Sequence, residues 1–188
     1  MLIKKLSDNS KEYLDAYYLI VDTLKNQLQS LETCNSISQT YIQQSLPLGE
    51  SAIDFSNNIL KYTTDIEIEN LAKAIIEQQN LSLEYLRSIL DECTCATNSE
   101  RDINLYKRKA LEIISNMLNR LNLIQGTNNL NFLYLQAMLY HNESVVALAK
   151  NALNYDLCPK LKQHINEQLV KYTAQQTLMR NLLNTYRR

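Results

Sequence analysis

The chain has 188 residues, of which 45% are apolar, and its mean hydropathy is −0.31. These values predict one soluble globular domain with a sizeable core, and we take residues 1–188 as that single domain. Nineteen basic and twenty acidic residues leave a net charge of −1 without a long run of one sign, so nucleic acid is not an expected partner.

Only two glycines and two prolines are present, so the chain has few residues that favour turns. This composition favours a few long helices. Apolar residues spaced three and four apart predict six of them. In chain order, the predicted helices cover residues 7–31, 36–62, 64–90, 100–125 and 129–155, and a last one from Pro159 onward. The sequence therefore predicts an all-α fold.

Particular residues mark where these helices bend or end. Pro47 removes an amide hydrogen inside the second helix and predicts a bend near Leu46. Thr64 and Glu67 form a predicted capping box at the start of the third helix. Gly126 is expected to end the fourth helix as a residue in the left-handed conformation.

An internal repeat sets the predicted architecture. Residues 134–155 match residues 41–62 without a gap, at an offset of 134 − 41 = 93, with eight identities in 22 positions. The apolar face of the first helix returns in the fourth at the same offset, which predicts repeats at 5–95 and 98–188. Two three-helix halves related by a pseudo-twofold axis would form a four-helix core, with the first and fourth helices outside.

No secretory signal is visible in residues 1–15, and no apolar run is long enough to cross a bilayer. We therefore expect a cytoplasmic protein without a membrane span. Four cysteines in that compartment are reduced by default, which leaves them as small hydrophobic residues or as soft metal ligands.

Two segments carry a resemblance to a known family. Residues 138–149, MLYHNESVVALA, resemble the signature Met-x-x-His-His-x-x-Ala-x-x-Met-Ala of the bacterial domain-of-unknown-function family 305. Residues 46–56, LPLGESAIDFS, resemble its variant Pro-His-His-x-x-Ala-Ile-Asp-Met-Ala, apart from the histidines. The family resembles ferritin-like four-helix bundles, and some members are associated with copper or other metals. The resemblance thus implies a ferritin-like bundle and a degenerate tandem copy of the motif.

Of the four histidines that a doubled motif would carry, only His141 is present, because Leu48, Gly49 and Asn142 occupy the other places. His141 falls on the apolar face of its helix, so the simplest interpretation is a buried neutral imidazole bonded to a tyrosine or glutamine. The alternative pairs His141 with Met138, one turn earlier, as a soft site for Cu(I).

Enzyme chemistry finds little support in the sequence. A carboxylate-bridged metal pair in such a bundle needs Glu-x-x-His on two helices, and this pattern does not occur. Glu50 and Glu143 are expected to point toward the first and fourth helices or toward water. No glycine-rich phosphate loop, nucleophile elbow or His-Glu-x-x-His is present, so we predict that the protein is not an enzyme.

The cysteines are scattered in sequence but are expected to gather in space. Cys34, Cys93, Cys95 and Cys158 fall in the first, third and fifth connections, which an up-and-down bundle brings to one end, and His164 should point to the same end. Such a cluster would suit Cu(I) or Zn²⁺, or would form two redox-sensitive disulfides, or would be coincidence.

We therefore expect a non-enzymatic binding or structural protein that has lost most ancestral metal ligands, with an unknown protein partner and no cofactor. The alternative is a carrier or sensor that binds a soft metal, copper or zinc.

Overall fold

The computed structural model describes residues 5–31, 34–95 and 97–186, and these residues form an all-α bundle. The helices are α1 (Asp8–Gln29), α2 (Ile37–Leu60), α3 (Ile66–Ile89), the short 3₁₀ helix η1 (Glu92–Cys95), α4 (Glu100–Asn122), α5 (Leu130–Ala152) and α6 (Pro159–Tyr186). In the described part of the chain, no helix is long and apolar enough to cross a membrane.

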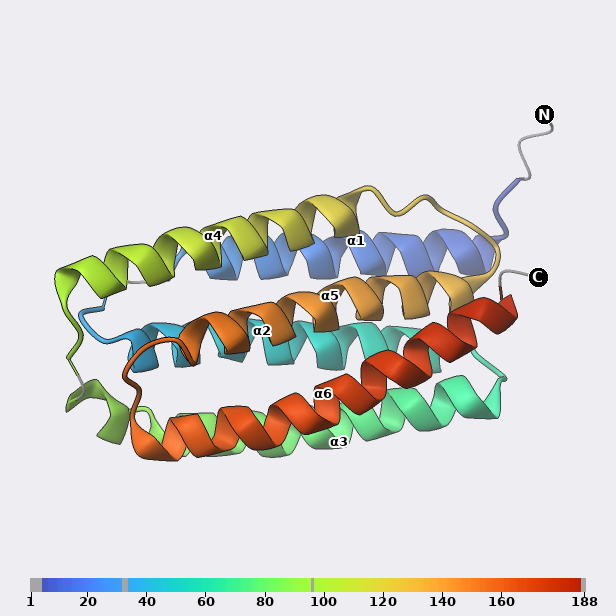
Figure 1. Cartoon of the computed structure of the whole chain (residues 1–188). Coiled ribbons are helices and arrows are strands. Elements are labelled where there is room, and N and C mark those ends of the chain that lie inside the picture. The colour runs from blue at the N-terminus through green and yellow to red at the C-terminus, as the bar shows by residue number, and fades with distance from the viewer. Residues whose placement is uncertain (1–4, 32–33, 96, 187–188) are drawn as a thin grey trace.

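The helices form three layers of two, with α2 and α5 between the α1/α4 layer and the α3/α6 layer (Figure 1). Fifteen residues are buried in each of α2 and α5, whereas α1 and α4 bury six each. The predicted all-α bundle is thus confirmed. The tyrosines Tyr13, Tyr17 and Tyr106 of these two helices are fully buried, so α1 and α4 contribute to the core as α3 and α6 do.

Buried asparagines fix the outer layer to the central one in both halves. Asn58 Nδ2 in α2 donates to the carbonyl oxygen of Tyr13 in α1 at 3.0 Å. At an offset of 93 residues, Asn151 Nδ2 in α5 donates to the carbonyl oxygen of Tyr106 in α4 at 3.2 Å. A buried amide that loses such a partner costs about 1–3 kcal/mol, so these bonds set the register of the helix pairs.

Pro47 lies inside α2, which is continuous through this residue. The N-cap of α3 differs from the predicted one. Asp65, and not Thr64, is the N-cap of α3, and its carboxylate accepts from the amides of Glu67 at 2.8 Å and Ile68 at 3.3 Å. The predicted box was wrong by one residue because an aspartate satisfies two amides and also carries a charge that the helix N-terminus favours.

The prediction for Gly126 was wrong in its physical reason. The C-cap of α4 is Leu123, and no glycine in the described chain has a positive φ. A Cβ at Gly126 would lie 2.7 Å from Leu14 Cδ1 of α1. The glycine is therefore needed for the close approach of the α4–α5 connection to α1, and not for a left-handed turn.

Candidate functional site

One end of the bundle holds the α1–α2, α3–α4 and α5–α6 connections, at the left in Figure 1. We call this end the cysteine pole, because Cys34, Cys93 and Cys158 lie in these connections. Cys93 and Cys158 form a disulfide with Cα atoms 5.4 Å apart. The expectation that all four cysteines are reduced is therefore wrong for this pair, which the packing brings within bonding distance across 65 residues.

Cys34 is one of the two cysteines outside this disulfide, and its side chain is described. The Cys34 thiol is buried and donates to Gln43 Oε1 at 3.2 Å. The side chain of Cys95 lies outside the part of the chain whose side chains the structure describes. Among the residues that it does describe, no group of three or more His, Cys, Asp or Glu side chains could hold a metal ion.

Asn98 joins the three connections of the cysteine pole, and no sequence signal marked it. Its backbone amide donates to the carbonyl oxygen of Asn35 at 3.3 Å, and its Oδ1 accepts from the amide of Ile37 at 2.9 Å. Its Nδ2 donates to the carbonyl oxygen of Asp156 at 2.9 Å. The Asn98 side chain thus bonds to the backbone at the start of α2 and in the α5–α6 connection. These bonds hold the α3–α4 connection, which contains Cys93, against the α5–α6 connection, which contains Cys158.

A second joint between α3 and α6 lies at the opposite end of the bundle. Tyr186, the last residue of α6, donates its hydroxyl proton to Asp65, the N-cap of α3. These positions are related to the disulfide by the repeat offset, because 93 + 93 = 186 and 158 − 93 = 65. The hydrogen bond from Tyr186 is the main cause that lowers the pKa of Asp65 below its usual 3.8.

Midway between these joints, Gln79 Nε2 of α3 donates to the Tyr172 hydroxyl of α6 at 3.2 Å. Their numbers differ by 172 − 79 = 93, so each residue meets its own counterpart where a pseudo-twofold axis would pass. The α3/α6 layer is thus held at both ends and in the middle.

His141, the one motif histidine, is 3% exposed and is held by backbone and serine atoms. Its Nε2 lies 3.0 Å from the carbonyl oxygen of Leu48, which can only accept, so Nε2 carries the proton. Ser51 Oγ donates to the same carbonyl at 2.9 Å and lies 3.1 Å from Nε2. Burial lowers the pKa of His141 to about 4 and keeps the ring neutral. The buried neutral ring was predicted, but its partners are not a tyrosine or glutamine.

Met138 and His164 are two further predicted metal ligands whose side chains the structure describes. Met138 is buried on α5, yet it does not line the cavity that His141 lines. His164 does not point to the cysteines: its Nε2 lies 2.9 Å from Ser82 Oγ, and its ring stacks on Tyr85 with centroids 4.7 Å apart. Burial also lowers the pKa of His164.

Both histidines of the chain line one cavity of about 20 Å³ between α2, α3, α5 and α6. Its other polar lining residues are Tyr41, Ser45, Gln79, Ser82, Gln168 and Tyr172. A cavity of this size with polar walls has room for about one water molecule. We call it the histidine cavity.

The other motif positions are filled by the packing of the protein itself. A Cβ at Gly49 would lie 2.8 Å from Leu83 Cδ2 and 3.2 Å from Gln79 Oε1 of α3, so α3 occupies the space that a histidine would need. Asn142 donates from Nδ2 to Gln175 at 3.2 Å and accepts at Oδ1 from Gln176 at 2.9 Å. Neither position leaves room or a free donor atom for a metal ion.

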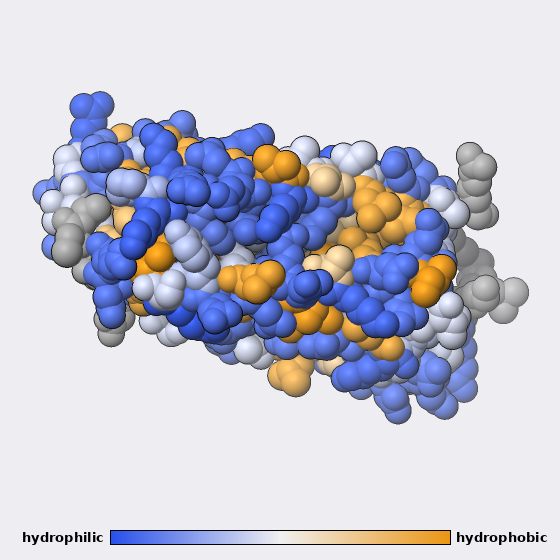
Figure 2. Space-filling view, turned by 90° about the horizontal axis from the view of Figure 1, so that it is seen from below, coloured by the Kyte–Doolittle hydropathy of each residue, from blue (hydrophilic) through white to orange (hydrophobic). Residues whose placement is uncertain are grey.

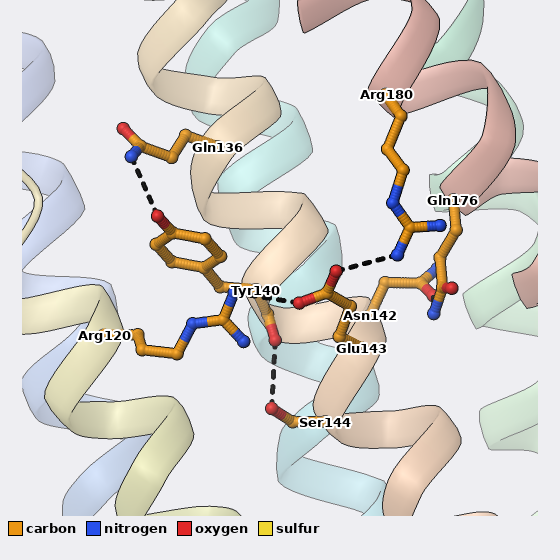
Figure 3. Close-up of polar contacts among 8 residues, drawn as sticks. All are labelled: Arg120, Gln136, Tyr140, Asn142, Glu143, Ser144, Gln176 and Arg180. Carbon is orange, nitrogen blue, oxygen red and sulfur yellow. Dashed lines mark hydrogen bonds and ion pairs between the residues drawn. The ribbon is translucent and has the colours of Figure 1, made fainter.

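Glu143 joins three helices, as Figure 3 shows. Its two carboxylate oxygens accept from Arg120 of α4 and Arg180 of α6, each at 2.8 Å, and Arg120 also lies 3.8 Å from the ring centroid of Tyr140. The repeat-related Glu50 accepts from Gln27 of α1 at 3.3 Å and from Arg87 of α3 at 2.7 Å. Both glutamates thus reach α1 or α4, as predicted, and also reach α3 or α6.

The outer face of the α3/α6 layer carries an apolar groove of about 410 Å³ away from the cysteine pole. Its apolar lining residues are Leu71, Ala74, Ala174 and Leu178. Figure 2 shows this face, and apolar side chains gather at the end where α3 begins and α6 ends. At the repeat-related place near the cysteine pole, the stacked rings of Tyr85 and His164 lie between the helices instead.

Comparison with known proteins gives a family and no characterised relative. No curated protein and no solved structure matches the chain. A family model does match, and its span runs from the second residue of α2 to near the end of α6, which covers the motif positions Leu48, Gly49, His141 and Asn142. The chain therefore belongs to the family described as the domain of unknown function DUF305, whose model matches residues 38–183.

Proposed function

We propose that this protein is a non-enzymatic binding or structural protein. It is a member of its family in which the residues at the metal-binding positions pack against or bond to other parts of the protein. The single observation that carries this proposal is the state of the four motif positions. Leu48 is apolar, α3 closes the space at Gly49, Asn142 is held by two glutamines, and His141 donates its Nε2 proton to the protein backbone.

A ferritin-like oxidoreductase is disfavoured by the same geometry. The glutamates that lie next to the motif, Glu50 and Glu143, each face an arginine from α3 or α6 and lie at the rim of the layers rather than in the histidine cavity. Carboxylates neutralised by arginine in this way have little tendency to bridge metal ions. The tandem origin that the sequence suggests accounts for the recurrence of these pairs at an offset of 93 residues.

A second candidate is binding of a soft metal at the cysteine pole, because Cys93 and Cys158 have Cα atoms only 5.4 Å apart. Once reduced, two thiolates at this spacing would bind Cu(I) or Zn²⁺. This function requires a reducing compartment, such as the cytoplasm expected from the sequence. A disulfide is instead typical of proteins from oxidising compartments.

Elemental analysis separates the two candidates. The protein is purified without an affinity tag, once with and once without a thiol reductant, and its copper, zinc and iron contents are measured. We expect less than about one tenth of a metal ion per chain in both samples. A stoichiometric metal content in the reduced sample that disappears in the Cys93→Ser/Cys158→Ser variant would establish the second candidate and overturn the first.

A further inference from the structure

The disulfide lies just beyond the end of α3 and just before the start of α6, two helices that line the histidine cavity. Cys158 directly precedes Pro159, the first residue of α6, and His164 follows six residues later, or about 9 Å along a helix. Cys93 lies in η1, just after α3, whose last turns supply Ser82 and Leu86 to the cavity wall. The bond therefore fastens the end of α3 to the start of α6 beside the cavity between them.

The polar contacts of the α6 start are weaker than the disulfide, while Leu161 and Ile165 of its first two turns are buried in the core. The Cys158 amide donates to Ser38 Oγ at 2.9 Å, and Lys160 pairs with Glu92, with both side chains 56% exposed. An exposed ion pair contributes between about 0 and 1 kcal/mol. At the far end of α6, Tyr186 and Asp65 hold the helix whatever the state of the cysteines.

We propose that the Cys93–Cys158 disulfide is a redox-controlled clasp, and that its reduction releases the first turns of α6 and opens the histidine cavity. The reaction is thiol–disulfide exchange with a dithiol. The sulfur–sulfur bond breaks, two S–H bonds form, and the dithiol supplies two electrons and two protons as it closes to a cyclic disulfide. The far end of α6 stays attached, so the motion is local.

Opening has a chemical consequence for the histidines. In the closed state, the Nε2 atoms of His141 and His164 lie within hydrogen-bond distance of protein groups, and burial lowers the pKa of both rings. When α6 moves away, His164 leaves Ser82 and Tyr85, and water reaches His141. The reduced protein thus exposes two imidazoles that the oxidised protein keeps covered.

Hydrogen exchange of the full chain, measured peptide by peptide, tests the clasp. We expect dithiothreitol to raise amide exchange about ten-fold or more in residues 159–168, with residues 173–186 and 123–129 unchanged. Modification of His164 by diethyl pyrocarbonate should rise in parallel. Alkylation followed by peptide mapping verifies that Cys93 and Cys158 are the thiols released.

Two variants sharpen the test. Cys93→Ser/Cys158→Ser should show the open pattern without dithiothreitol and no further response to it. Tyr186→Phe weakens the repeat-related joint at the other end and should leave exchange in residues 159–168 as in the oxidised wild type. Unchanged amide exchange in fully reduced protein would overturn the proposal, because the disulfide would then not hold the start of α6. An equal rise of exchange over the whole chain would also overturn it, because the disulfide would then stabilise the whole fold and not this segment.

Discussion

The two ends of the α3/α6 layer are joined at equivalent positions by different chemistry. At the cysteine pole the joint is the covalent bond between Cys93 and Cys158, and at the opposite end it is the hydrogen bond from Tyr186 to Asp65. The hydrogen bond connects the last residue of α6 to the N-cap of α3, and the disulfide connects η1, just after α3, to the residue before α6. The two connections should respond to different conditions, because reduction breaks a disulfide whereas protonation of Asp65 weakens the hydrogen bond.

The same contrast appears in the centre of the molecule. Residues 48–51, Leu-Gly-Glu-Ser, and residues 141–144, His-Asn-Glu-Ser, occupy equivalent turns of α2 and α5. The glutamate and serine are common to both, whereas the first two positions differ in size and polarity. Substitutions that make one half resemble the other therefore measure what each difference contributes to the free energy of unfolding.

The largest effect is expected from removal of the covalent joint. The Cys93→Ser/Cys158→Ser variant should lose about 3–4 kcal/mol in free energy of unfolding, because the disulfide closes a loop across 65 residues and restricts the unfolded chain. Urea denaturation of the variant and of oxidised wild type measures the difference. A loss below about 1 kcal/mol would mean that the two joints are energetically alike.

Replacement of Gly49 by the residue of the second half comes next. Gly49→Asn should lose about 2–3 kcal/mol, because the new side chain meets Leu83 and Gln79 and brings a polar group into a packed interface. The reciprocal Asn142→Gly is the matched control and should lose about 1–2 kcal/mol, through glycine in a helix and the lost bonds to Gln175 and Gln176. Wild-type stability of Gly49→Asn would refute the idea that α3 closes this position.

The hydrogen-bonded joint should contribute less than the covalent one. Tyr186→Phe is expected to lose about 1 kcal/mol at neutral pH. Because the pKa of Asp65 is lowered in the folded state, this contribution is present above pH 3.8 and is lost as pH falls through the folded pKa. Denaturation curves of wild type and variant should therefore approach each other as pH falls below 3.8, and a difference that grows in acid would contradict the assignment.

Alkaline pH gives a second measurement of this joint. Burial, followed by the hydrogen bond to Asp65, raises the pKa of Tyr186 to about 12. A raised pKa contributes stability below the unfolded value of 10, and this is lost as pH rises from 10 to about 12. The phenylalanine variant should lack this part of the alkaline loss.

The smallest effect at neutral pH is expected for His141→Leu, which installs the residue found at Leu48. The carbonyl oxygen of Leu48 keeps the bond from Ser51, so the free energy of unfolding should change by no more than about 1 kcal/mol. Removal of a buried polar ring acts in the stabilising direction. Since the folded pKa is about 4, wild type loses stability as pH falls from 6.5 to 4, and the variant should lack this slope. A loss above about 3 kcal/mol would reveal a ligand or an essential network.

The sequence alone determined the helices and the family, because both depend on local patterns. The three-and-four spacing of apolar residues predicted six helices, and each begins or ends within a few residues of its predicted bounds. The motif segments at 46–56 and 138–149 predicted the family that the chain belongs to. The cap at Asp65 was missed by one residue, since two neighbouring residues could each accept from the first amides.

Only the tertiary structure decided which distant residues meet. The sequence placed four cysteines near one end, but packing selected Cys93 and Cys158 as the bonded pair, and it turned His164 toward α3 instead of toward the thiols. Likewise, Asn98 and Gly126 act through residues 58 or more positions away. Helical periodicity fixes which face of a helix is buried, whereas the rotation and distance between packed helices fix the contacts, and those are set by many side chains together.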